Sequence, residues 1–113
     1  DFGLQHDYGS TSRTVYGFGV LDGLNGYVPP ASWAQWNHIA VTRDSTGLIK
    51  LFINGTLRKS ATNIGAISGN RPLYIGGGAG YSVANSYFAE IRFTKGVPVY
   101  TENFTPPGAF IPA

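Results

Sequence analysis

The sequence contains no cysteine. A disulfide framework and a thiolate metal site are therefore both excluded, and the redox compartment stays open. No run of apolar residues approaches the length that spans a membrane, and no basic-then-apolar signal segment opens the sequence. We therefore expect no membrane insertion, and any export signal would lie outside the sequence given.

Charged residues are also scarce, at 12% of the chain, with a formal net charge of +2. The eight Lys and Arg residues are scattered from Arg13 to Lys95 without a run or a stripe. A surface that follows a phosphate backbone needs clustered cations, so nucleic-acid binding is not expected.

Glycine (16 residues) and proline (7) are abundant, which favours many turns and short strands over helices. With 113 residues and 42% hydrophobic content, the chain predicts one all-β domain over residues 1–113 with a modest core.

Residues 36–55 organise the rest of the chain, because apolar side chains alternate there with the period of a half-buried strand. Asp-Ser-Thr-Gly at residues 44–47 predicts the turn between two antiparallel strands. The dipeptide Asn54-Gly55 tolerates the positive φ angles of a tight hairpin, so a third strand is expected at about 57–61. The alternating residues are Ile39 and Val41 in the first strand, and Ile49, Leu51 and Ile53 in the second.

Four further strands are expected, at residues 14–21, 26–28, 73–76 and 87–94, and residues 96–113 should form an ordered tail packed over the sheets. Two isolated isoleucines in the loop after the third strand should tuck against a sheet edge. The last strand would carry Tyr87, Ala89, Ile91 and Phe93 on one face and Phe88, Glu90 and Arg92 on the other; the two isoleucines are Ile64 and Ile67.

Four motifs in this order resemble successive strands of the laminin G-like, concanavalin A-like lectin/glucanase fold. They are WNHIAVTR at 36–43, LFING at 51–55, LYIGG at 73–77 and FAEIR at 88–92. The ending, TKGV at 94–97 with NFTPP at 103–107, is similar to that of such modules in bacteriophage structural proteins and bacterial surface proteins. The resemblance covers roughly residues 36–107.

The resemblance implies an antiparallel β-sandwich, or jelly roll, that recognises carbohydrate or protein on a virion (phage tail or capsid surface) or a cell surface. Family members usually have further strands before the position of Thr14, so we expect a fragment, a reduced fold, or a subunit whose sheet edges neighbouring chains cover. Two functions follow: a non-catalytic carbohydrate- or receptor-binding module, or a structural decoration module completed by other chains without a soluble ligand.

Enzyme activity is not expected, because the clustered acidic strand motif of the family's glucanases is absent and a glycosidase needs two carboxyl groups flanking one bond. Glu90 should pair with a neighbouring cation or loop amide, and the ring of His38 should be satisfied by a backbone partner. The acidic residues are Asp1, Asp7, Asp22, Asp44, Glu90 and Glu102.

Sugars are bound by aromatic faces beside polar groups, so aromatic residues in loops with polar neighbours are the candidate ligand contacts. Trp36, in contrast, is expected in the core at the start of a central strand. No cofactor is expected; calcium has weak support, from Asp22 with Asn25 or from Asp7. The candidate ligand-binding residues are Tyr8, Arg13, Trp33, Arg71, Tyr81 and Asn85.

Overall fold

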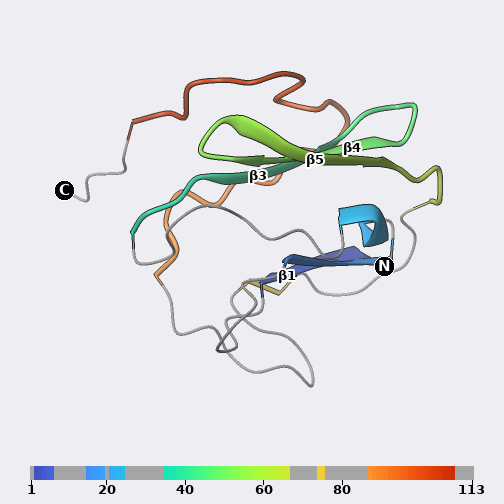
Figure 1. Ribbon diagram of the computed structural model, residues 1–113, viewed down its shortest axis with the longest axis horizontal. Coiled ribbons are helices and arrows are strands. Elements are labelled where there is room, and N and C mark those ends of the chain that lie inside the picture. The colour runs from blue at the N-terminus through green and yellow to red at the C-terminus, as the bar shows by residue number, and fades with distance from the viewer. Residues whose placement is uncertain are drawn as a thin grey trace.

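The described part of the computed structural model is antiparallel β-structure in two layers, a three-stranded sheet above a two-stranded one (Figure 1). The structure describes residues 2–6, 15–19, 21–24, 35–66, 74–75 and 87–108. The elements are β1 (Phe2–His6), β2 (Val15–Gly19), the 3₁₀ turn η1 (Asp22–Leu24), β3 (Ile39–Arg43), β4 (Leu48–Ile53) and β5 (Thr56–Thr62).

The meander predicted from residues 36–55 is confirmed as the sheet β3-β4-β5. At the first turn, Oδ1 of Asp44 accepts hydrogen bonds from the Thr46 hydroxyl (2.6 Å), the Thr46 amide (2.8 Å) and the Leu48 amide (3.1 Å). Gly47 completes this turn at φ 83°. The side chain of Asp44 thus fixes the register of the first hairpin.

The second turn is also confirmed. Asn54 and Gly55 have φ angles of 52° and 81°, the left-handed values of a two-residue hairpin turn. β5 then contains a bulge, because Leu51 pairs with Lys59 whereas Phe52 pairs with Leu57. The extra residue is Arg58, and the sequence analysis did not predict this bulge.

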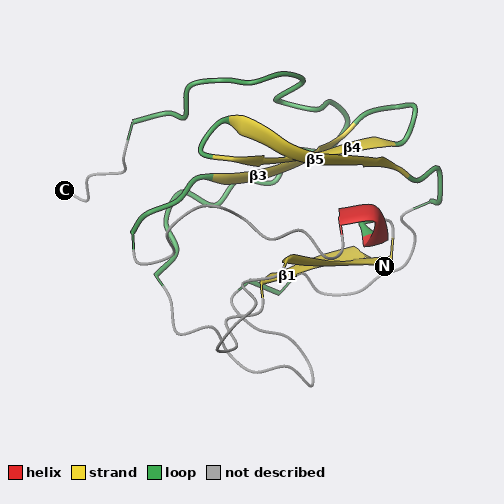
Figure 2. Cartoon of the chain, in the orientation of Figure 1, coloured by secondary structure: helices red, strands yellow, loops and turns green. Residues whose placement is uncertain are grey.

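The core lies on the inner face of β4. Its side chains Ile49, Leu51 and Ile53 are almost completely buried, which confirms the alternation seen in the sequence. They pack with Leu21 and Leu24, which flank and form η1. η1 lies between the two layers and so links the lower sheet to the upper one (Figure 2).

The outer face of the same sheet is covered by the C-terminal segment, as Figure 1 shows in red. The Phe104 amide donates to the Gly55 carbonyl (2.9 Å), and Lys50 Nζ donates to the Thr101 carbonyl (2.5 Å). The Asn103 side chain accepts from the Leu57 amide (2.8 Å). The predicted packing of the tail is thus confirmed for residues 98–106.

Other predicted elements are corrected. Residues 87–94 and 74–75 are not in strands, although strands were expected at 87–94 and 73–76. Glu90 has φ 53°, a left-handed value that a continuous strand cannot accommodate. β2 ends at Gly19 instead of continuing to residue 21, where the chain turns into η1.

One of the two isoleucines expected to tuck against a sheet edge was placed wrongly. Ile64 is 85% exposed and does not tuck against a sheet edge. Arg43 explains the path of this loop, because its Nη2 donates to the carbonyls of Asn63 and Gly65, both at 2.6 Å, and holds the backbone there. Ile67 and the strand expected at 26–28 lie outside the described residues.

Candidate functional site

Trp36 is 67% exposed, so its expected place in the core is wrong. It precedes β3 in a segment that hydrogen bonds hold to the turn between β4 and β5. The His38 amide donates to Asn54 Oδ1 (2.9 Å), and the Asn54 amide donates to the His38 carbonyl (2.8 Å). These paired bonds fix the backbone on one side of Trp36 and leave its indole pointing outward.

Side-chain amides continue this network. Asn54 Nδ2 donates to Asn37 Oδ1 (3.0 Å), and Asn37 Nδ2 donates to the Gln35 carbonyl (3.0 Å). An amide oxygen accepts two hydrogen bonds and an amide nitrogen donates two, so Asn54 keeps capacity for a ligand. Trp36 is therefore an exposed aromatic side chain on a backbone that is preorganised by amides.

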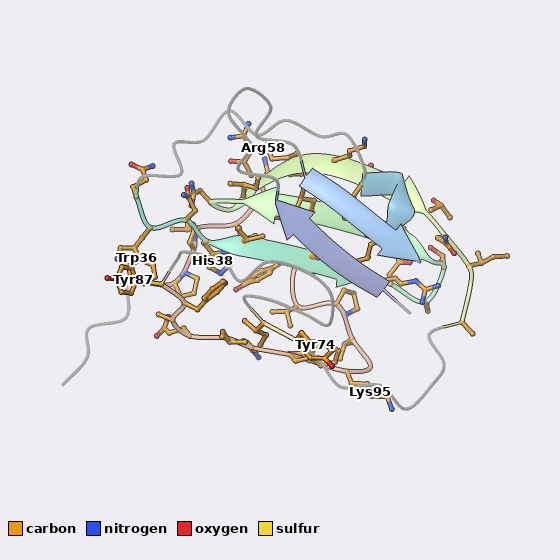
Figure 3. All side chains as sticks on the ribbon, turned by 90° about the horizontal axis from the view of Figure 1, so that it is seen from below. Trp36, His38, Arg58, Tyr74, Tyr87 and Lys95 are labelled. Atoms are coloured by element: carbon orange, nitrogen blue, oxygen red, sulfur yellow. The ribbon has the colours of Figure 1, made fainter. Side chains whose placement is uncertain are left out.

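Tyr87 is 90% exposed and lies at the same corner of the domain. Figure 3 shows Tyr87 and Trp36 together, and Figure 1 agrees that the segment starting at residue 87 begins beside the segment leading into β3. We call Trp36, Tyr87, Asn37 and Asn54 the aromatic corner. Two aromatic side chains flanked by amides form the kind of surface that stacks on a sugar ring and bonds its hydroxyls.

An aromatic cluster supports this corner from behind. The rings of Tyr100 and Phe104 stack with centroids 3.6 Å apart and an interplanar angle of 5°. The His38 ring meets Phe104 edge-on at 5.4 Å and Tyr100 at 5.9 Å, and Phe52 contacts Phe104 at 5.4 Å. The C-terminal segment therefore packs directly against His38, two residues after Trp36, and against Phe52 of β4.

Among the described residues, the ring of His38 does not have the backbone partner that was expected. Its Nδ1 is buried and has no hydrogen-bond partner among the described residues. The backbone amide of His38 is satisfied by Asn54, but the ring itself is surrounded by aromatic side chains. We interpret His38 as a packing residue of this cluster.

A small hollow lies at the other end of β4, lined by polar and apolar groups of the sheet and of the C-terminal segment. Asp44 is its carboxylate, and the hydrogen bond from the Thr46 hydroxyl, with those from the Leu48 and Thr46 amides and the charge of Lys50, lowers its pKa. That carboxylate is used to hold the first hairpin turn, so we interpret the hollow as part of the structure and not as a ligand site. Its lining residues are Thr42, Asp44, Leu48, Lys50, Pro98, Tyr100 and Thr101.

All six candidate ligand residues from the sequence lie outside the described residues, as do Asp7 and Asn25 of the weak calcium hypothesis. Asp22 is in η1. In the part of the chain that the structure describes, no group of three or more His, Asp or Glu residues could hold a metal ion. Glu90 is exposed and is not on a strand. The six residues are Tyr8, Arg13, Trp33, Arg71, Tyr81 and Asn85.

Sequence reasoning missed Trp36 and Tyr87 as surface residues. The alternation that identified β3 was extended back to residue 36, but β3 begins only at Ile39. The available signal was the neighbouring Asn37, since Asn competes for backbone hydrogen bonds and favours the ends of strands.

A family model described as the concanavalin A-like lectin/glucanases superfamily, of laminin G type, matches residues 7–97. The chain belongs to this superfamily. The predicted family and all-β fold class are thereby confirmed, and the match begins well before the motifs that suggested it. No curated protein and no solved structure matches the chain significantly.

Membership in the concanavalin A-like superfamily makes this a lectin/glucanase-type domain, consistent with carbohydrate binding. Laminin G-like lectin domains are generally non-catalytic and typically extracellular or on surfaces, although the superfamily includes glucanases. Within the described ranges, no helix is long and apolar enough to cross a membrane.

Proposed function

We propose that this domain is a non-catalytic carbohydrate- or receptor-binding module of a phage tail, a virion or a bacterial surface protein. The observation that carries the proposal is the aromatic corner, where Trp36 and Tyr87 are exposed beside the amides of Asn37 and Asn54. Membership in a lectin-type superfamily supports carbohydrate as the ligand class. The phage or bacterial source is supported by the closing motifs at 94–97 and 103–107.

Binding at this corner would use stacking and hydrogen bonds in separate roles. The indole face of Trp36 covers the apolar C–H patch of a pyranose, and the phenol of Tyr87 adds a second face with a hydroxyl at its tip. The amides of Asn37 and Asn54 bond sugar hydroxyls. Because the bonds between His38 and Asn54 already fix the backbone, little ordering is required on binding.

Six further residues are proposed as ligand contacts on the basis of their chemistry alone. They combine aromatic side chains with guanidinium and amide groups, which are the chemical types that grip sugars. No metal is proposed to take part. The residues are Tyr8, Arg13, Trp33, Arg71, Tyr81 and Asn85.

A glycan array, followed by calorimetry on any sugar that binds, tests the proposal. Trp36→Ala should abolish binding, and Trp36→Phe should retain part of it because an aromatic face remains. Ile64→Ala is the matched control, since Ile64 is also highly exposed but lies in the loop after β5. EDTA should leave binding unchanged. Sugar affinity that is equal in Trp36→Ala and the parent would refute this site, and turnover of a β-glucan would refute the non-catalytic role.

An assembly module is the second candidate, and a separate observation favours it. Every described residue from 87 to 97 is exposed, and five of them are large hydrophobic side chains: Tyr87, Phe88, Ile91, Phe93 and Val97. Contiguous apolar surface on a small domain commonly marks a contact with another protein. A folded chain that stays monomeric at high concentration in sedimentation and joins no larger assembly would contradict this candidate.

A further inference from the structure

The segment 87–95 runs beside β3 on the side away from β4 (Figures 1 and 3). Its sequence, YFAEIRFTK, alternates like a strand, but the backbone is not in a strand. The interruption is at Glu90, whose φ of 53° is unfavourable for a residue with a side chain. The segment thus has the side-chain pattern of a strand that the isolated chain does not form.

Several large apolar side chains along this segment are exposed to water. Phe88 is 54% exposed, Ile91 is 58% exposed, and Tyr74 beside the segment is more than half exposed. Together with Phe93, the aromatic side chains alone leave roughly 350 Å² in contact with water. This lies within the range of the largest apolar patch on a typical monomer, which is often an interaction site. It is also close to half of the roughly 800 Å² that each partner contributes to a standard interface.

The charged residues of the segment are arranged so that one copy complements a second, antiparallel copy. Glu90 and Arg92 flank Ile91 symmetrically, with Phe88 and Thr94 further out. If two copies of the segment run antiparallel about a two-fold axis at Ile91, each Glu90 faces Arg92 of the other copy. The same symmetry places Phe88 opposite Thr94 and Ala89 opposite Phe93. Two opposite-charge pairs and an apolar centre are the features of a self-complementary interface.

We propose that residues 87–95 pair with the same segment of a second copy of this chain, antiparallel and centred on Ile91. Pairing satisfies backbone groups along the segment and covers its apolar side chains, and Glu90 moves from the left-handed to the extended region as the strand forms. The inference gives the assembly candidate a specific partner. Tyr87 belongs both to this segment and to the aromatic corner, but the pairing is argued from the segment alone and does not require glycan binding at Trp36.

Charge exchange tests the proposed register. Sedimentation equilibrium should show a dimer, and Glu90→Arg or Arg92→Glu should each weaken it by roughly tenfold, because two-fold symmetry replaces two attractive pairs with two repulsive ones. The double variant E90R/R92E should recover the affinity of the parent. Arg58→Glu is the matched control: it makes the same change of charge as Arg92→Glu at the bulge of β5, away from the segment (Figure 3).

A single cysteine provides an independent readout, because the chain has none of its own. Ile91 faces its own copy at a Cα separation of about 4.5 to 5.5 Å in an antiparallel pair, which suits a disulfide. Ile91→Cys should therefore oxidise to a covalent dimer much faster than Ser45→Cys, which puts the thiol in the exposed first turn.

Three results would overturn the pairing: a monomer at every concentration, a double exchange no tighter than the single variants, or equal rates of cross-linking at positions 91 and 45. A monomer that still binds sugar through Trp36 would overturn the pairing and leave the proposed function intact. A dimer that is weakened by the single charge variants and restored by the double variant, but binds no sugar, would support the pairing and overturn the proposed glycan binding.

Discussion

Adding one methyl group at Gly55 tests two features at once, the second hairpin turn and the packing of the C-terminal segment against it. Its φ of 81° disfavours any residue with a Cβ, and a Cβ built there would overlap the Phe104 carbonyl oxygen. The Gly55 carbonyl also accepts the Phe104 amide at 2.9 Å. Gly55→Ala therefore strains the second hairpin turn and pushes the C-terminal segment away from the sheet.

The expected loss of stability has two parts. The left-handed conformation costs an alanine about 1 to 2 kcal/mol. Displacing Phe104 breaks a hydrogen bond that contributes about 1 kcal/mol. A total of about 2 to 3 kcal/mol is a large share of the stability of a small domain, which is commonly about 5 to 15 kcal/mol.

The free energy of unfolding in urea, measured for three glycine variants, separates the backbone strain from the loss of the contact with Phe104. Gly96 has φ 106° but a Cβ there meets no atom within 4 Å, so Gly96→Ala should show the strain alone. A Cβ at Gly108 also meets nothing, so Gly108→Ala should change stability by less than about 0.5 kcal/mol. If Gly55→Ala is no more destabilising than Gly96→Ala, the C-terminal segment does not pack on the turn and the reasoning is refuted.

Two further predictions concern the first turn and the aromatic cluster. The Asp44 pKa is lowered in the folded state, so Asp44 contributes stability above its unfolded pKa of about 4, and this contribution is lost as the pH falls through the folded value. The melting temperature of Asp44→Asn should therefore depend less on pH below about 4 than that of the parent, and parallel pH curves for the two would contradict this role. Phe104→Ala removes the ring stacked on Tyr100 and against Phe52, and because Phe104 is only half-buried we expect a loss of about 2 kcal/mol in urea unfolding. Val97→Ala is its control, since Val97 is exposed, and equal losses in the two variants would show that the cluster does not stabilise the fold.

The β3-β4-β5 meander was predictable because its information is local. Asp44 bonds groups two and four residues away, and Asn54-Gly55 adopts a conformation that these residue types favour by themselves. The alternation of Ile49, Leu51 and Ile53 then decides which face packs against Leu21 and Leu24, while Phe52 is buried on the opposite face. Such features need no knowledge of the rest of the chain.

Trp36 and residues 87–94 were misplaced because their information is not local. The position of Trp36 depends on bonds between residues 37–38 and Asn54, which are 16 and 17 positions apart. For residues 87–94, alternation identifies a segment able to form a strand but not the partner that it requires. A strand exists only where a neighbour satisfies its backbone, and Glu90, with a φ of 53°, interrupts the extended conformation that such pairing needs.

The turn at Asn54-Gly55 holds two segments that border the aromatic corner, the residues before β3 and the C-terminal segment. Through its side chain, Asn54 fixes the segment that presents Trp36, and through its backbone Gly55 holds Phe104 and the C-terminal segment. The backbone next to Trp36 is therefore tied to this hairpin turn, and His38 also packs in the aromatic cluster with Tyr100 and Phe104. A binding residue outside any strand can then be as well positioned as a residue within one, because its backbone is tied to the most ordered turn of the sheet.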